Sequence, residues 1–335
     1  MTKYTNKKID AGIIGSGYGN YVILEAINKL NFIKNKTIFG RNKNKIEKLF
    51  MSGKVNIADH SIQKFINRNN ELLCIATLPN IQYEILKKIK LNKYRYYLLE
   101  KPLANNFNNC KKLFKKFKNI KSRVAVDFIF LALKSFQNFK KILKNKNIKQ
   151  VRIKWHFNAF HFRKKIINSW KKKPKFGGGI YHFYIIHIIA YINYFFGRIL
   201  KIENKKEIKN TSNDLCGVKL NLVCKNKLKI YLDFNSNSKK KIHSINVYTS
   251  KNNFKLENKS NDYVKNFKII TNKKNKKISK NFLFKKNYKN LDSRVEPVVE
   301  LIKKLVIKKK PISTIKDAYI ASEDLQKIIK KNATN

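Results

Sequence analysis

The spacing of hydrophobic and polar residues changes part-way along the 335-residue chain. In the first third, short apolar runs alternate with stretches in which apolar residues recur every three or four positions. The apolar runs, which predict buried parallel strands, are IDAGIIG (9–15), TIFG (37–40), LLCIAT (72–77), YYLLE (96–100) and RVAVDF (123–128). The other stretches, which predict helices, are 21–30, 42–51, 80–90, 107–118 and 133–144. This alternation predicts a doubly wound α/β sheet.

A different rhythm follows residue 148. Apolar and polar residues alternate over 151–157, 218–223, 228–234 and 244–249, which predicts strands with one buried face. The tail returns to helical spacing, with Pro311 between two helices and Ser313 or Thr314 as the N-cap of the second. We therefore predict a dinucleotide-type domain at 1–125 and a second domain at 126–335. The second is an antiparallel-sheet domain whose closing helices are candidates for packing back on the first.

The composition raises the question of nucleic-acid binding. The chain is 43% hydrophobic, enough for sizeable cores, and its formal net charge is +56. Such a charge is typical of proteins that bind nucleic acid or a membrane surface. However, lysine is over-used along the whole chain together with asparagine, isoleucine and the aromatics, as in a protein from an AT-rich genome. We therefore favour a solvated lysine coat over a specific nucleic-acid surface. The charge would still favour acidic small molecules, such as phosphorylated cofactors and sugar nucleotides.

The four cysteines show no C-x-x-C spacing. This argues against a metal site or a disulfide framework and favours a reducing compartment. The N-terminal sequence MTKYTNKKIDAGIIG is polar and has no apolar signal core before the first strand. We expect a cytoplasmic protein without a metal.

The segment GIIGSGYGN (12–20) joins the first predicted strand to a helix. Gly15 and Gly17 would allow a tight turn and let a pyrophosphate approach backbone amides at the helix N-terminus. The third glycine of G-x-G-x-x-G would fall at Asn20, and Gly19 lies one place early. The alternative is a purely structural turn. The position of the glycine segment after the first strand favours a dinucleotide site that includes Tyr18.

The end of the second strand, TIFGRNKNK, bears on the choice of dinucleotide. NAD sites usually carry an acid here for the ribose hydroxyls, and this chain has Arg41 instead. An arginine guanidinium can bind a 2′-phosphate by donating two hydrogen bonds to it. The sequence therefore favours NADP over NAD, although basic residues are common everywhere in the chain.

Polar residues also end the next strands. Thr77 follows one strand, and Pro79 and Asn80 start the helix behind it. The following strand ends in Glu100 and Lys101. Ligands of doubly wound folds bind beyond the carboxyl ends of the strands, so these residues are candidate cofactor contacts. Asp127, a polar exception in VAVDF, is a candidate substrate contact at the same edge.

Taken in order, GSGYG, ATLPN, LLEKPLA and W…GGG…H resemble the Gfo/Idh/MocA family of oxidoreductases over nearly the whole chain. The resemblance implies an N-terminal Rossmann domain and a C-terminal α/β domain with an open, mostly antiparallel sheet. It also implies NAD(P)-dependent hydride transfer at a hydroxyl or keto group of a sugar, cyclitol or sugar nucleotide. The lysine of the EKP motif, here Lys101, contacts cofactor and substrate in the family. A cis bond before Pro102 is implied as well.

The apolar run after the glycine triplet, KFGGGIYHFYIIH (175–187), is long enough to suggest a membrane span, a buried core helix or an active-site wall. The resemblance implies a helix that carries an Asp and a His beside the EKP lysine. His187 matches that histidine, and Phe183 stands at the acid position. Family branches that handle surface-polysaccharide sugars also carry an aromatic here. On an α-helix Phe183 and His187 would share a face, and His182 would point elsewhere.

The segment WHFNAFHFRKKIINSWK (155–171) precedes the glycines. In two-domain relatives it crosses the mouth of the cleft. His161, Arg163 and Trp170 are therefore candidate substrate contacts, with Arg163 for an anionic group. Ordinary packing is the alternative for each of them.

The sequence thus predicts an NAD(P)-dependent dehydrogenase or reductase acting on a sugar or sugar nucleotide, with Lys101 and His187 relaying the hydroxyl proton. We expect a homo-oligomer with no membrane span and no specific nucleic-acid partner. A catalytically silent cofactor-binding regulator is the first alternative, favoured by Phe183. A nucleic-acid-binding protein is the second, favoured only by the charge. The sequence leaves open the substrate, the direction of the reaction, the oligomeric state and the effect of Phe183.

Overall fold

The computed structural model describes residues 8–163, 169–273, 276–282, 288 and 290–333. They fall into two compact units. The first comprises Met1–Ala132 with Lys286–Tyr319, and the second comprises Leu133–Lys285 with Ile320–Asn335. The C-terminal part of the chain therefore contributes to both units, and the functional boundary expected after residue 125 stays a prediction.

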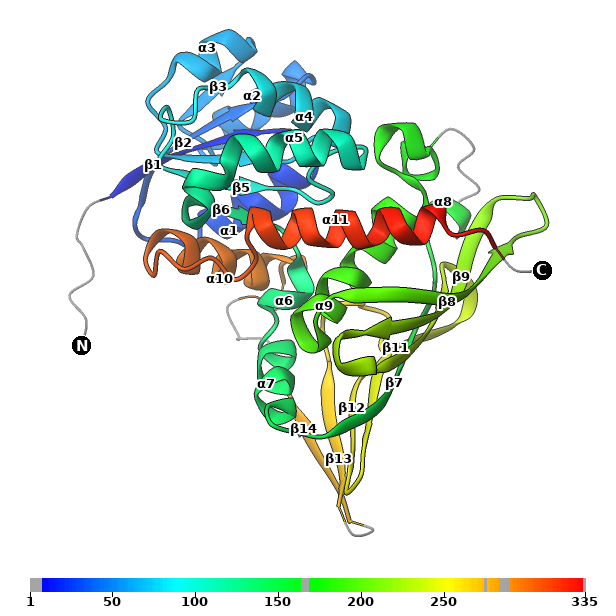
Figure 1. The fold of residues 1–335 in the computed structure, drawn as a ribbon. Coiled ribbons are helices and arrows are strands. Elements are labelled where there is room, and N and C mark those ends of the chain that lie inside the picture. The colour runs from blue at the N-terminus through cyan, green and yellow to red at the C-terminus, as the bar shows by residue number, and fades with distance from the viewer. Residues whose placement is uncertain (1–7, 164–168, 274–275, 283–287, 289, 334–335) are drawn as a thin grey trace. The chain divides into compact units, whose positions relative to one another are not determined.

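The first unit is built on a parallel six-stranded sheet in the order β3-β2-β1-β4-β5-β6 (Figure 1). Its strands are β1 (Ile9–Ile14), β2 (Ile33–Phe39), β3 (Ile57–Asp59), β4 (Leu72–Ile75), β5 (Tyr96–Leu99) and β6 (Val124–Val126). The helical segments are η1 (Gly19–Leu24), α1 (Glu25–Ile27), α2 (Lys43–Met51), α3 (Ile62–Asn67), α4 (Pro79–Lys88), α5 (Phe107–Phe117), η2 (Lys118–Arg123) and α6 (Ile129–Ala132). The predicted doubly wound sheet is confirmed, since a helical segment returns the chain between successive strands.

Helix α10 (Val295–Val306) joins this unit from the C-terminal part of the chain. It contacts η1, α1 and α6, and its apolar face enters the main hydrophobic core of the unit through Val298, Leu301 and Ile302. Thr314 then caps the next helix as predicted, because its hydroxyl accepts from the Asp317 amide at 3.2 Å. The amide of Thr314 donates in return to Asp317 Oδ2 at 2.7 Å.

The second unit holds an eight-stranded sheet in the order β14-β13-β12-β11-β7-β10-β9-β8. The strands are β7 (Ile148–Asn158), β8 (Ile199–Lys209), β9 (Leu215–Cys224), β10 (Lys229–Asn235), β11 (Asn237–Thr249), β12 (Asn253–Asn258), β13 (Lys268–Lys273) and β14 (Lys276–Asn281). Only the β7–β10 pair is parallel among these strands as the structure describes them. The mostly antiparallel sheet is thus confirmed. In β7, Val151, Ile153 and Trp155 are buried while Arg152 and Lys154 are exposed, as the alternation predicts.

The second unit also contains helical segments that precede β8 in the chain. They are α7 (Lys134–Leu143), α8 (Phe160–Arg163), η3 (Trp170–Lys172), η4 (Pro174–Phe176), η5 (Tyr181–Ile185) and α9 (Ile186–Phe196). Tyr184 of η5 packs edge-on against Trp155 of β7, with ring centroids 6.0 Å apart. The stretch Pro174–Phe196 is long and apolar enough to cross a membrane by length and composition alone. Because 61% of its most apolar window is buried in the fold, we read it as a core element of this unit.

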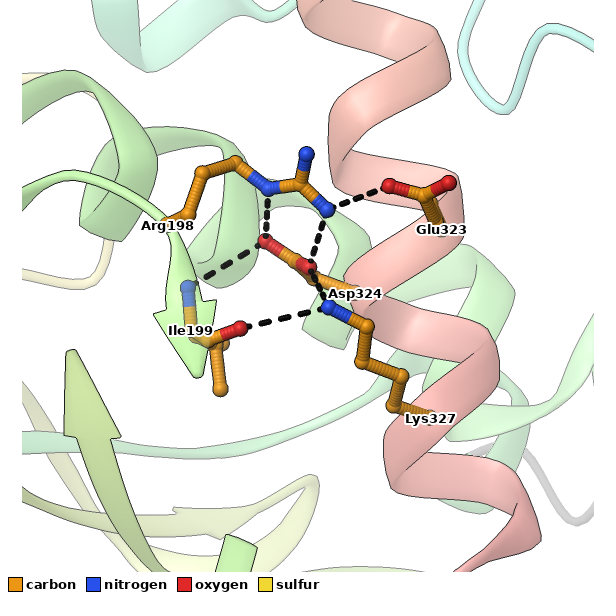
Figure 2. Close-up of polar contacts among 5 residues, drawn as sticks. All are labelled: Arg198, Ile199, Glu323, Asp324 and Lys327. Atoms are coloured by element: carbon orange, nitrogen blue, oxygen red, sulfur yellow. Dashed lines mark hydrogen bonds and ion pairs between the residues drawn. The ribbon is translucent and has the colours of Figure 1, made fainter. Parts of the chain in front are cut away.

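Helix α11 (Ile315–Lys330) is fastened to the start of β8 by a buried carboxylate (Figure 2). Asp324 is fully buried and accepts two hydrogen bonds from the Arg198 guanidinium, at 2.7 and 3.0 Å. Glu323 pairs with the same guanidinium. Lys327 donates to Asp324 Oδ1 at 2.9 Å and to the Ile199 carbonyl at 3.3 Å. Two cations and a backbone amide thus surround the buried charge, as burial of a carboxylate requires.

Candidate functional site

The turn between β1 and η1 is shaped by its glycines. Gly15 has a φ of +118°, and an added Cβ would lie 2.3 Å from the Ala76 carbonyl oxygen just beyond β4. A Cβ on Gly19 would lie 3.0 Å from the Ile13 side chain, so Gly19 allows the close helix–strand approach expected of a third glycine. Gly17 is exposed, with nothing within 4 Å of an added Cβ. The turn therefore leaves its backbone open toward a ligand, as pyrophosphate binding requires.

The end of β2 lies beside this turn. The Gly15 amide donates to the Phe39 carbonyl at 2.8 Å, and the exposed Arg41 follows two residues later. Asn42 caps α2 by accepting from the Lys45 amide at 2.9 Å. Arg41 is thus carried at the carboxyl edge of the sheet, where the sequence placed it.

Residues that follow β4 and β5 gather at the same edge of the sheet. Pro79 and Asn80 begin α4, with Thr77 just before it. The Oδ1 atom of Asn80 is buried and has no hydrogen-bond partner among the described residues. Buried polar atoms are normally satisfied, so this acceptor suits a donor from a bound ligand. The open glycine turn and this acceptor fit a dinucleotide.

Lys101 follows β5 on a loop that hydrogen bonds from Gln82 hold in place. The Lys101–Pro102 peptide bond is cis, as the resemblance implied. The side chain of Gln82, from α4, donates to the carbonyls of Glu100 at 2.8 Å and Leu103 at 3.1 Å. It accepts from the Glu100 amide at 3.1 Å. The backbone on both sides of Lys101 is therefore tied to α4.

A cluster of buried polar groups surrounds the base of this loop. The Tyr18 hydroxyl donates to Asp127 Oδ2 at 2.7 Å, which links the glycine turn to the end of β6. Asp127 is 3% exposed. Glu100 is its neighbour, because Leu99 and Val126 are paired in the sheet and each is followed by one of the two carboxyls. Two acids from adjacent strands thus meet beside Tyr18.

Arg294, at the start of α10, is the cation on the other side of Tyr18. Its guanidinium lies 5.1 Å from the centroid of the Tyr18 ring and 5.3 Å from that of Tyr21. Asp292 holds it with two hydrogen bonds, at 2.8 and 2.7 Å. The distances to both rings are within cation–π range.

These neighbouring groups shift the pKa values of Glu100, Asp127 and Tyr18. Loss of solvent and the nearby charge of Asp127 raise the pKa of Glu100 well above its ordinary value, against the opposing charges of Lys101 and Arg294. Burial raises the pKa of Asp127 as well, and there the hydrogen bond from Tyr18 and the charge of Lys101 oppose it. Burial and the same two carboxyls raise the pKa of Tyr18. Both carboxyls are therefore harder to ionise here than in water, and the upward shift in pKa is the larger for Glu100.

The second unit carries the other predicted catalytic residue. His187 is the second residue of α9 and is 8% exposed. The Phe183 ring lies in η5, where it packs edge-on against Trp170 at 5.6 Å and Tyr184 at 4.8 Å between centroids. The ammonium of Lys171 lies 5.2 Å from the Phe183 centroid. Lys101 and His187 belong to different compact units, so their joint action stays a prediction.

The helix geometry expected around His187 needs a correction. The spacing predicts an α-helix here, but Tyr181–Ile185 is a π-helix. The amide of Ile186 donates to the carbonyl of Tyr181, five residues earlier. A π-turn holds more residues than an α-turn, so residues four apart such as Phe183 and His187 still lie near one face. The α-helical separation of His182 from His187 does not carry over to this turn.

The predicted substrate residues occupy different surroundings. His161 is 4% exposed and packs against the rings of Phe162 and Tyr184. Burial lowers its pKa to about 4, helped by the charges of Lys171 and Lys172. Trp170 is half-buried against Phe183. The side chain of Arg163 lies outside the described residues, and all three stay predictions as ligands.

Two family models match the chain. One, described as an oxidoreductase family with an NAD-binding Rossmann fold, matches residues 9–128. The other, described as the C-terminal alpha/beta domain of that oxidoreductase family, matches residues 140–334. The chain belongs to the Gfo/Idh/MocA oxidoreductase family. This confirms the family that the motifs indicated, and with it an oxidoreductase with a nicotinamide-dinucleotide fold.

Solved structures of similar fold extend the comparison. KijD10, a 3-ketoreductase from Actinomadura kijaniata solved with NADP and TDP-benzene, is 12% identical with a TM-score of 0.78, over 96% of this chain and 97% of that one. An oxidoreductase from Thermotoga maritima is 15% identical with a TM-score of 0.80, over 97% and 96%. An Agrobacterium radiobacter oxidoreductase with NAD+, L-tartaric acid and magnesium is 12% identical with a TM-score of 0.77, over 96% and 95%. A search of curated proteins found no significant match.

The family fold brings two residues to the candidate site that the sequence analysis missed. Gln82 lies inside an ordinary helical pattern, and nothing in its neighbours marks it. Arg294 is one of 76 basic residues and is far from the other site residues in the chain. Only the return of α10 to the first unit reveals its place.

Acidic, histidine and cysteine side chains elsewhere suggest no further centre. Within the described part of the chain, no group of three such residues could hold a metal ion. The four cysteines are buried.

Proposed function

We propose that the protein is an NAD(P)-dependent dehydrogenase or reductase that acts on a sugar nucleotide, with Lys101 as its acid–base group. The main support for this proposal is the set of residues at the carboxyl edge of the first unit's sheet. There an open glycine turn, an unsatisfied Asn80 oxygen and Lys101 above a buried acid pair come together. Family membership supports the redox chemistry.

When bound, the nicotinamide would supply a carbon that gives or accepts a hydride. The chain's own residues bind, orient and move a proton. Gly15, Gly17 and Gly19 would receive the pyrophosphate, flanked by Tyr18, and Thr77, Pro79, Asn80 and Glu100 would line the nicotinamide end. Lys101 would donate a hydrogen bond to the carbonyl oxygen in reduction, or accept the hydroxyl proton in oxidation. His187 would be the second proton relay.

Arg41 favours NADP as the dinucleotide. A guanidinium beside the glycine turn can bind a 2′-phosphate with two charge-assisted hydrogen bonds. The solved relatives include one with NADP and one with NAD+, so the comparison leaves this choice to the residues of this chain.

A nucleotide-linked sugar is favoured as substrate by charge and by the second unit. The chain carries a net +56, which attracts anionic ligands. Trp170 and Phe183 offer rings beside the Lys171 ammonium, a combination suited to a sugar and a phosphate. KijD10, of similar fold, was solved with a TDP compound. A place in surface-polysaccharide sugar biosynthesis would fit the aromatic at 183, and Asp127, His161 and Arg163 remain proposed substrate contacts.

We also propose a cytoplasmic homo-oligomer, and four buried cysteines without C-x-x-C spacing agree with a reducing compartment. A second candidate is a cofactor-binding regulator without turnover, which Phe183 at the family's acid position favours. Mass spectrometry of small molecules retained on purification, followed by a sugar-nucleotide panel read at the nicotinamide absorbance, separates the two. A retained dinucleotide with turnover supports the enzyme. A retained dinucleotide without turnover of any panel member supports the regulator.

A further inference from the structure

Gln82 makes four polar contacts with one short piece of backbone. Its amide nitrogen lies 2.8 Å from the Glu100 carbonyl oxygen, 3.1 Å from that of Leu103 and 3.4 Å from that of Pro102. Its amide oxygen accepts from the Glu100 N–H at 3.1 Å. The residue is 0% exposed. A single buried side chain therefore holds the backbone before and after Lys101.

The helix that carries Gln82 also begins the proposed cofactor site. Pro79 and Asn80 form the first turn of α4, and Gln82 lies within one turn of them. The Gln82 contacts therefore join this turn to the Lys101 loop, so that the two are held in a fixed relation. Glutamine suits this place, because a buried side chain must here both donate to carbonyls and accept from an amide.

We propose that Gln82 is a positioning residue that fixes the Lys101 loop relative to the dinucleotide-binding start of α4. The proposal rests on the proposed function of Lys101. Acid–base catalysis requires the Lys101 ammonium within hydrogen-bond reach of the substrate oxygen. A displacement of about 1 Å can cost on the order of 10²-fold in rate. The competing explanation is that Gln82 only satisfies buried carbonyls and contributes stability.

Gln82→Met removes all four contacts at similar side-chain length. The matched control is Lys116→Met, since the Lys116 ammonium donates to the carbonyls of Leu86, Lys87 and Ile89 at 2.9, 2.7 and 2.7 Å. Each variant thus loses several hydrogen bonds that involve α4. Gln82→Met loses those between α4 and the Lys101 loop, and Lys116→Met loses those at the opposite end of the helix. Gln82→Glu, which keeps an acceptor for the Glu100 amide, serves if the methionine variant does not fold.

Four measurements are made on the full chain. They are turnover with NADPH or NADP and the sugar-nucleotide panel, NADPH affinity by fluorescence, amide exchange by mass spectrometry, and the rate of Lys101 acetylation by mass spectrometry. We expect Gln82→Met to lower kcat by about 10²-fold with NADPH affinity and KM changed only a few-fold. The Glu100 amide should lose exchange protection, and the acetylation rate of Lys101 should change relative to other lysines. Lys116→Met should leave kcat and Lys101 acetylation near the wild-type values.

Equal kcat in the two variants, corrected for folded protein, would overturn the positioning role, and so would unchanged exchange and acetylation at 100–103. Failure of the proposed function looks different. In that case the wild-type protein turns over no panel member, while exchange and acetylation still distinguish Gln82→Met from Lys116→Met.

Discussion

At the carboxyl edge of the first sheet, Glu100 and Asp127 place two carboxyls next to each other in a chain that has only 20 acidic residues. Tyr18 donates to one of them, and burial raises the pKa of both, against the opposing charges of Lys101 and Arg294. Such pairs of acids with displaced pKa values gather at functional sites. The pair therefore marks this edge of the sheet as a candidate functional site.

Replacing Glu100 tests that environment. Its folded-state pKa is raised, so the folded protein keeps a proton that the unfolded chain loses above about pH 4.3. Folding stability contributed by this group therefore falls as the pH rises from that value through the higher folded pKa. Glu100→Gln should gain stability relative to wild type between pH 4 and neutral pH, measured by urea unfolding. The exposed control Glu300→Gln should show no such trend, and a Glu100→Gln difference independent of pH would contradict the assignment.

Arg41 carries the prediction on cofactor choice. If its guanidinium binds the 2′-phosphate, Arg41→Ala removes charge-assisted hydrogen bonds that NAD does not make. NADP affinity should fall by about tenfold or more, and NAD affinity by much less. Calorimetric titration of both dinucleotides measures this. Equal losses would mean that Arg41 does not distinguish them.

Among the elements, α11 depends on a single buried carboxylate. Asp324 is 0% exposed and is surrounded by Arg198, Lys327 and the Ile199 amide. Removing one partner of a buried charge pair leaves the others desolvated and uncompensated. The attachment of α11 to β8 should therefore be a sensitive point of the second unit.

Asp324→Ala should lower the free energy of unfolding by about 3 kcal/mol, because it leaves the Arg198 guanidinium without its main partner. Glu300→Gln breaks a pair whose two side chains are 38% and 39% exposed, and should cost about 1 kcal/mol or less. Denaturant unfolding followed by circular dichroism compares the two. Similar small losses of unfolding free energy for both variants would show that Asp324 does not hold α11 to β8.

The elements that the sequence missed have physical reasons. β3 and α3 are only three and six residues long, too short for a periodic signal. β8 and β13 are lysine-rich, so one face lacks the apolar alternation that predicts a strand. The π-helix at Tyr181–Ile185 has no composition signature, and its backbone pattern follows from packing.

For the whole molecule, the charge is the most visible property and the least specific. A lysine coat binds any polyanion through counterion release, without reading bases. A charge of +56 therefore predicts binding without predicting recognition.

We expect weak binding to DNA and RNA at low salt that disappears steeply toward about 150 mM salt and shows no sequence preference. Filter binding or fluorescence anisotropy over a salt series, with several unrelated oligonucleotides, measures it. Tight binding to one defined sequence that survives physiological salt would favour the nucleic-acid alternative.

The fold was predictable because hydrophobic periodicity and the ordered motifs act locally in sequence. The glycine turn, the EKP segment and the two types of sheet all leave such local signals, and the structure confirms both sheets. The environment of the site could not be predicted in this way. Tyr18 lies 109 positions from Asp127 and 276 positions from Arg294 in the chain, and no local pattern encodes these contacts or the Glu100–Asp127 pair.

Turnover by Lys101→Met tests the central claim most directly. The wild-type and variant proteins are compared on the sugar-nucleotide panel at the nicotinamide absorbance, with dinucleotide affinity measured in parallel by fluorescence. If Lys101 is the acid–base group, the variant should lose roughly 10²–10⁴-fold in kcat while its dinucleotide affinity stays within a few-fold of wild type. Near-normal turnover in the variant would contradict the account.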